Sequence, residues 1–135
     1  MILSTPKYEF QSRVNKFILT KPRIGVFAYY GAGKTYMSLE WLSTLDQPFP
    51  TYVVCTNSSL FQWAQQVKEH STFSVATISG DSSSKYTQLM TALKEDKQIV
   101  LVNWDLIRNA TLLGHLKGIK IRSVIFDESI KLKGH

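Results

Sequence analysis

Residues 28–35 read Ala-Tyr-Tyr-Gly-Ala-Gly-Lys-Thr, and this stretch decides the fold. A small residue, four further residues and Gly-Lys-Thr form the phosphate-binding pattern called the P-loop. The apolar run Ile24–Ala28 before it predicts a buried strand, and the spacing over Thr35–Leu45 predicts a helix. A strand that breaks into a glycine loop and then a helix points backbone N–H groups and the positive helix end at one place, which suits a triphosphate.

Each residue of this loop has a chemical reason to be there. Gly31 and Gly33 let the backbone curl without a Cβ clash, and Ala32 lies between them in the same cradle. Lys34 is expected to reach the β- and γ-phosphates, and the Thr35 hydroxyl is expected to hold Mg²⁺. Taken alone, the pattern also fits an ordinary glycine turn before a helix.

Composition bounds the class of protein. The chain has 135 residues, of which 44% are hydrophobic, so it is one domain or part of one, with enough apolar residues for a core. A net charge of +6 favours a polyanionic partner, although it is spread along the chain and also serves solubility. Cys55 is the only cysteine, which predicts a reduced thiol. With no signal peptide and no long apolar segment, we expect a cytoplasmic protein outside the membrane.

Strands and helices are expected to alternate throughout the chain. Strands are predicted at residues 24–28, 51–55, 73–78, 98–102 and 122–126, and helices at 7–20, 35–45, 58–70, after the turn at 80–84, and at 103–116, where a break near Asn109 is an option. Ser58 or Ser59 is expected to cap the third of these helices. Short connections between alternating elements predict an α/β fold: a mostly parallel sheet with helices on both faces, in three layers.

A second motif ends the last predicted strand. Ser123-Val124-Ile125-Phe126-Asp127-Glu128 runs from apolar residues into two acids, which is the Walker B pattern. In a parallel sheet this motif and the P-loop emerge at the same edge, so Asp127 is expected to complete the Mg²⁺ shell with Thr35. Glu128 is expected to orient and deprotonate the attacking water. A small-molecule kinase needs only the first acid, so the pair favours hydrolysis.

Several segments together resemble one family. Residues 127–133, Asp-Glu-Ser-Ile-Lys-Leu-Lys, resemble the Asp-Glu-Ala-His-x-Leu-Lys motif of superfamily-two helicases, and the Leu-Lys tail is most similar to Swi/Snf-type DNA translocases and their phage-encoded relatives. Residues 54–63 resemble motif Ia of that family, and residues 100–108 resemble its Ile-Thr-Thr-Tyr-Glu-x-Leu segment. Residues 8–11 resemble the Tyr-x-x-Gln of a Q-motif.

The resemblance implies that residues 1–135 are a single, incomplete N-terminal RecA-like lobe of a nucleic-acid-dependent ATPase that uses ATP and Mg²⁺. It implies that Gln11 reads the adenine edge and that Ser58, Ser59 and Asn103 contact nucleic acid, with DNA favoured over RNA; helix capping is the simpler alternative for these three. Lys34 and Glu128 would carry catalysis. Trp63 lies on an apolar helix face, which predicts packing.

The chain departs from the family pattern in two ways. Ile130 stands where the family has His, which puts coupling between the ATP site and later motifs in question. The sequence ends at His135, before the family's second RecA-like lobe, so this chain alone is expected to bind ATP and hydrolyse it very slowly. A second RecA-like lobe, or a host helicase or DNA-repair protein, is the expected protein partner. The alternative is a stand-alone, non-catalytic module that binds nucleic acid or a host helicase as a regulator or decoy, in the host cytoplasm if phage-encoded.

Overall fold

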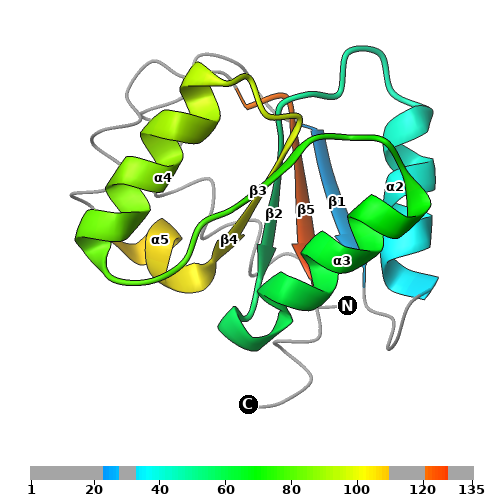
Figure 1. The fold of residues 1–135 in the computed structure, drawn as a ribbon. Helices are drawn as coiled ribbons and strands as arrows, with labels where there is room; N and C mark the ends of the chain where they lie inside the picture. Colours follow the sequence, from blue (N-terminus) through cyan, green and yellow to red (C-terminus); the bar gives the residue numbers. More distant parts are fainter. Residues whose placement is uncertain (1–22, 28–32, 110–120, 128–135) are drawn as a thin grey trace.

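Five parallel strands form one sheet, in the order β1-β5-β2-β4-β3 (Figure 1). The computed structural model describes residues 23–27, 33–109 and 121–127. The strands are β1 (Arg23–Phe27), β2 (Thr51–Cys55), β3 (Val75–Thr77), β4 (Ile99–Asn103) and β5 (Ser123–Asp127). The helices are α2 (Gly33–Ser43), α3 (Leu60–His70), α4 (Ser82–Lys94) and α5 (Trp104–Arg108), with a short 3-10 turn, η1 (Asn57–Ser59), before α3. The predicted α/β architecture is confirmed.

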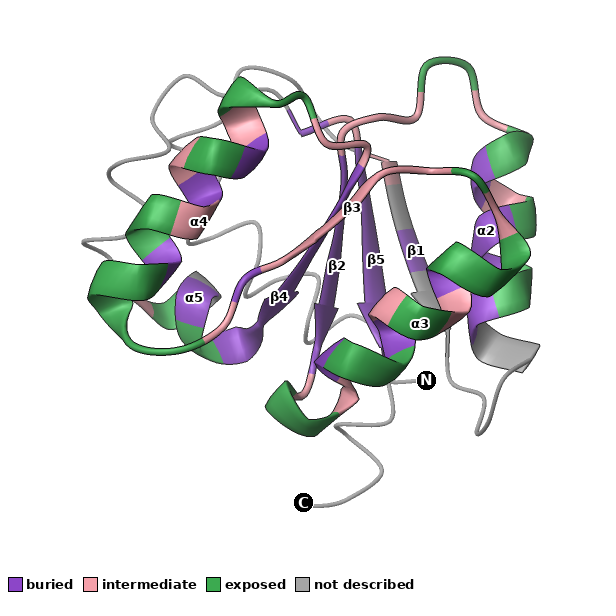
Figure 2. Ribbon diagram, viewed as in Figure 1, coloured by how far each residue is buried: buried purple, intermediate pink, exposed green. Residues whose placement is uncertain are grey.

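Helices cover both faces of the sheet, which explains why its central strands are buried along their whole length. Every residue of β2, β4 and β5 is buried, as Figure 2 shows by colour. On one face α2 and α3 pack in a cluster that includes Leu42, Trp63 and Leu101. On the other face α4 and α5 pack in a cluster that includes Leu89 and Trp104. Continuous burial of this kind is typical of parallel sheets.

The strand register brings the ends of distant segments to one edge of the sheet. Phe27, the last residue of β1, pairs with Asp127, the last residue of β5. Cys55 at the end of β2 pairs with Asn103 at the end of β4. The arrowheads in Figure 1 all point to this carboxyl edge. The end of β1, the Walker B acid Asp127 and the segment after β2 that leads into α3 therefore lie at the same edge of the sheet, where ligands of parallel sheets bind.

The predicted boundaries differ from the observed ones at a few places. β2 has the predicted bounds, whereas α2 ends at Ser43, because the N–H groups of Thr44 and Leu45 bond to carbonyls only three residues back. The predicted helix over 103–116 is present as α5, and it ends before Asn109, whose backbone is extended. The predicted helix over 7–20 lies outside the described residues.

Candidate functional site

Asp127 is a buried carboxylate at the carboxyl edge. It is 1% exposed, and its Oδ2 accepts a hydrogen bond from Trp63 Nε1 at 3.1 Å. Trp63 comes from the second turn of α3 and is itself buried at 2% exposure, so the predicted packing role is confirmed. Packing is only part of its role, because a carboxylate removed from water needs donors and the indole supplies one. Sequence reasoning missed this contact.

Thr35 lies at the same edge on α2. Its side chain is buried, with 2% exposure, and it is the third residue of a helix that begins at Gly33. The first N–H groups of a helix have no partner within it and carry the positive end of its dipole. The buried Thr35 hydroxyl on α2 and the buried Asp127 carboxylate at the end of β5 are hard oxygen groups of the kind that Mg²⁺ prefers as ligands. The described residues thus fit a Mg²⁺-nucleotide.

Several predicted nucleotide-binding residues cannot be placed in the same way. The predicted helix began at Thr35, whereas α2 begins at Gly33, so Lys34 is the second residue of the helix. Gln11, Gly31, Ala32 and Glu128 lie outside the described residues, so their roles stay predictions.

Ser58 and Ser59 begin the segment that leads into α3. Ser59 occupies the N-cap position of α3, as predicted, but its side chain forms no hydrogen bond that caps the helix. Instead the Thr56 hydroxyl lies 3.2 Å from the Ser58 Oγ and 2.8 Å from the Ser59 Oγ. The Thr56 hydroxyl engages both serine side chains in place of the cap. Ser58 is exposed and Ser59 half-buried at the carboxyl edge, where a phosphate backbone would have access to them.

Asn103 is the centre of a polar network at the end of β4. It is 5% exposed and caps α5, because its Oδ1 accepts a hydrogen bond from the Leu106 N–H at 3.2 Å. The same oxygen accepts from Lys85 Nζ at 3.3 Å, and its Nδ2 donates to Asn57 Oδ1 at 3.3 Å. The structure therefore gives this side chain a capping and connecting role. Its predicted contact with nucleic acid is not tested by this arrangement.

Lys85 is a buried lysine that sequence reasoning missed. It lies on α4 with 6% exposure, and within the described ranges its hydrogen bond goes to the neutral Asn103, with no carboxylate in an ion pair with it. A buried ammonium without a counter-charge is costly, so an anion at this edge would stabilise it. The signal was available, because Lys85 lies four residues before the buried Leu89 on the apolar face of the helix.

The first turn of α4, unlike that of α3, is capped by a side-chain hydrogen bond. The Asp81 carboxylate caps the helix by accepting a hydrogen bond from the Ser84 N–H at 2.9 Å. This backbone hydrogen bond, together with one from the Ser84 side chain, lowers the pKa of Asp81. The preceding Gly80 has a φ of +99°, which explains glycine at that turn.

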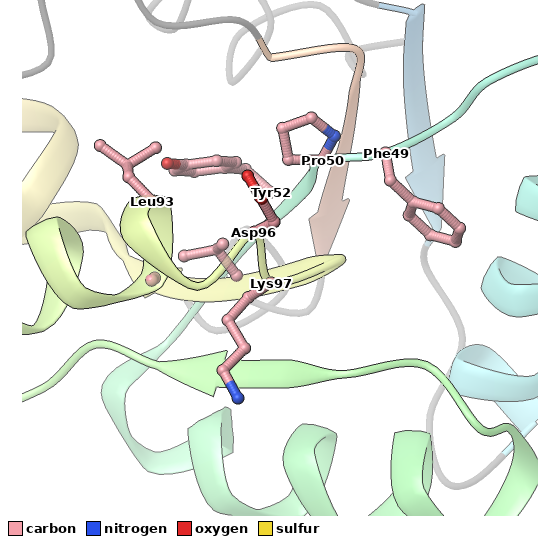
Figure 3. Close-up of a pocket in the computed structure, with 8 residues that line it drawn as sticks. Phe49, Pro50, Tyr52, Leu93, Asp96 and Lys97 are labelled. Carbon is pink, nitrogen blue, oxygen red and sulfur yellow. The ribbon is translucent and has the colours of Figure 1, made fainter.

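A cavity of about 260 Å³ lies at the opposite edge of the sheet, near the amino ends of β2 and β4 (Figure 3). Two charged residues, Asp96 and Lys97, contribute to its lining. The other lining residues are mostly apolar: Phe49, Pro50, Tyr52, Ala92, Leu93 and Val100. Burial raises the pKa of Tyr52. This cavity is lined by none of the predicted site residues, so the cavity and the predicted chemistry are at opposite edges.

Two comparisons with known proteins bear on this arrangement. A family model described as the SNF2-related domain matches residues 11–135, a range that contains every element of the fold. No curated protein matches the chain. Within the described ranges, no helix has the length and apolarity that crossing a membrane requires.

Proposed function

Since this chain belongs to the SNF2-related domain family, we propose that its α/β RecA-like fold is the nucleotide-binding lobe of a DNA-dependent ATPase. The observation that carries the proposal is the pairing of Phe27 with Asp127, which brings the Walker B acid to the strand that leads into the P-loop. Thr35 and Asp127 are both buried polar residues at that edge. ATPases of this family use ATP and Mg²⁺.

The proposed nucleotide site uses the P-loop and the two oxygen ligands. Backbone N–H groups of Gly31, Ala32 and Gly33 would hold the phosphates, with Lys34 as their charge partner. Thr35 and Asp127 would hold Mg²⁺, which when bound offsets the negative charge of the β- and γ-phosphates.

Two residues outside the described ranges complete the proposed chemistry. Gln11 would select adenine through paired donor and acceptor atoms. Glu128 would orient the attacking water and accept its proton.

The proposed nucleic-acid surface begins at η1. Ser58 and Ser59 offer hydroxyls at the exposed carboxyl edge, and Asn103 organises the neighbouring Asn57 and Lys85. Among the described residues Lys85 has no carboxylate partner, so phosphate is an anion that it would favour, and phosphate contacts dominate affinity for DNA. The net charge of +6 supports the same class of partner.

Nucleotide binding is tested by titrating the 135-residue chain with a fluorescent ATP analogue in Mg²⁺. Lys34→Ala is expected to weaken binding by about tenfold or more, because a charge-assisted hydrogen bond contributes about 1.5–3 kcal/mol. Lys94→Ala, at an exposed lysine in the last turn of α4, is the matched control and should bind like the wild type. Unchanged affinity in Lys34→Ala would overturn the site.

Hydrolysis is tested separately, by phosphate release with and without double-stranded DNA. Glu128→Gln is expected to keep ATP binding and to lose any DNA-stimulated turnover, since the amide cannot accept the proton of water. A Glu128→Gln chain with wild-type turnover would remove Glu128 from the mechanism. Stimulation by RNA alone would contradict the choice of DNA.

A further inference from the structure

Helix α3 connects the two proposed ligand sites. Its N-cap, Ser59, belongs to the proposed nucleic-acid surface, and Trp63 one turn later donates its indole N–H to Asp127, the proposed Mg²⁺ ligand. A helix of 11 residues is a stiff element, so its two contacts cannot move independently over so short a distance. The sequence separation between Trp63 and Asp127 is 64 residues, so this link exists only in the folded chain.

The Trp63 side chain is well placed to fix the orientation of the carboxylate. An indole N–H is a donor only, and its direction follows the ring. The ring is 2% exposed and packs in the cluster that contains Leu60 and Val67, so the donor has little freedom. The carboxylate of Asp127 therefore has one oxygen held in a direction that α3 sets. Outer partners of this kind orient metal ligands and tune metal affinity.

Trp104 shows that this arrangement is not a general consequence of tryptophan packing. It is also buried, with 8% exposure, and its ring stacks on Phe126, the residue before Asp127, with centroids 5.8 Å apart. Its Nε1 has no hydrogen-bond partner among the described residues. The same residue type therefore packs on both faces of β5, and only Trp63 reaches a carboxylate.

We propose that Trp63 is a positioning residue: its indole N–H orients the Asp127 carboxylate for Mg²⁺ and ties Mg²⁺ affinity to the placement of α3 at the nucleic-acid surface. This inference rests on the proposed function. The coupling between the DNA site and the Mg²⁺-nucleotide site must be reciprocal. If bound DNA changes the affinity for Mg²⁺-nucleotide by some factor, bound Mg²⁺-nucleotide changes the affinity for DNA by the same factor.

The test compares Trp63→Phe with the matched control Trp104→Phe. Affinity for an ATP analogue is measured with Mg²⁺ and with EDTA, and the ratio gives the Mg²⁺-dependent gain. Trp63→Phe is expected to lower this gain by about tenfold or more, the range typical for outer partners of a metal ligand, while affinity in EDTA stays unchanged. Trp104→Phe should keep the wild-type gain.

Two results would overturn the positioning role. An unchanged gain in Trp63→Phe would do so, as would an equal loss in Mg²⁺ and in EDTA, which indicates packing alone. A wild-type chain without any Mg²⁺-dependent gain would instead contradict the proposed function. If Trp63→Phe does not fold, the wild type decides: its Trp63 indole N–H resonance should shift when Mg²⁺ is added to the nucleotide-bound chain, and an unmoved resonance contradicts the proposal.

The link to nucleic acid needs its own measurement. The same titrations are repeated with a saturating DNA duplex, which gives the factor by which DNA changes nucleotide affinity. A coupling factor of about fivefold or more is expected in the wild type and in Trp104→Phe, and a factor near one in Trp63→Phe. Wild-type coupling in Trp63→Phe would show that the two sites communicate by another route and would overturn this half of the proposal.

Discussion

Two consecutive residues of β5, Phe126 and Asp127, make different kinds of contact with a tryptophan on the two faces of the sheet. Phe126 points to the face of α4 and α5, where Trp104 stacks on it with an interplanar angle of 21°. Asp127 points to the face of α2 and α3, where Trp63 donates a hydrogen bond to it. Successive strand residues alternate between faces, so one step along β5 changes a tryptophan contact from apolar packing to a polar link. Burial alone does not reveal a residue's role.

The two edges of the sheet differ in a related way. The carboxyl edge holds buried polar groups bound across elements, as in the network of Asn103, Lys85 and Asn57. The amino edge holds the apolar cavity beside Tyr52. The ATPase chemistry is proposed at the carboxyl edge. Buried polar side chains that are hydrogen-bonded to one another therefore indicate the proposed site better than the cavity does.

The largest effect is expected on the apolar face. Phe126→Ala removes a fully buried ring from beneath Trp104, and large-to-small changes of this kind cost about 3–5 kcal/mol of unfolding free energy. Urea denaturation measures it. A loss below about 1 kcal/mol would show that the Trp104 stack does not organise this face.

The next largest effect is the difference in unfolding free energy between substitutions of Trp63 and of Trp104. Trp63→Phe is expected to cost about 1.5–3 kcal/mol, because a hydrogen bond to a charged group is lost, in addition to a small packing loss. Trp104→Phe loses no hydrogen bond and should cost less. The same urea experiment tests both variants, and equal losses would contradict the distinction between the two faces.

Lys85→Met tests the carboxyl edge through opposite changes in stability and binding. The apolar side chain removes a buried charge that has no carboxylate partner in the described part of the chain, so stability should stay unchanged or rise by about 1 kcal/mol. DNA affinity should fall, with the slope of log affinity against log salt reduced by about one. Fluorescence anisotropy over a salt series measures the slope, with Lys94→Met as the control. A large loss of stability with unchanged DNA binding would make Lys85 purely structural.

The smallest effect on stability is expected at Asp81, the N-cap of α4, which belongs neither to the tryptophan contacts of β5 nor to the polar network of Asn103. Its pKa is lowered in the folded chain by the Ser84 N–H, so its stabilisation is present above the unfolded pKa of about 3.9 and is lost as pH falls through the folded pKa. Asp81→Ala should therefore lower the melting temperature slightly at pH 7 and much less at pH 2. A difference independent of pH would contradict this capping role, and nucleotide binding should not change.

The sequence predicted the elements better than the contacts between them. Alternating apolar runs and glycine turns predicted the parallel sheet, since local spacing determines burial in each strand. The Trp63–Asp127 bond was out of reach, because its partners lie far apart along the chain. The N-cap of α3 was predicted at the right position, Ser59, but its hydroxyl bonds to the nearby Thr56 hydroxyl and not to the helix backbone. Lys85 was predictable from its place on an apolar helix face.

The most direct test of a metal site beside Trp63 uses Mn²⁺ in place of Mg²⁺. Adding Mn²⁺ to the nucleotide-bound, ¹⁵N-labelled chain broadens signals close to the ion, and the chain's three tryptophans give separate indole resonances. The account predicts that the Trp63 resonance, assigned with Trp63→Phe, disappears at the lowest Mn²⁺ concentration. A Trp63 resonance that persists while the Trp104 resonance broadens would place the metal elsewhere and contradict the account.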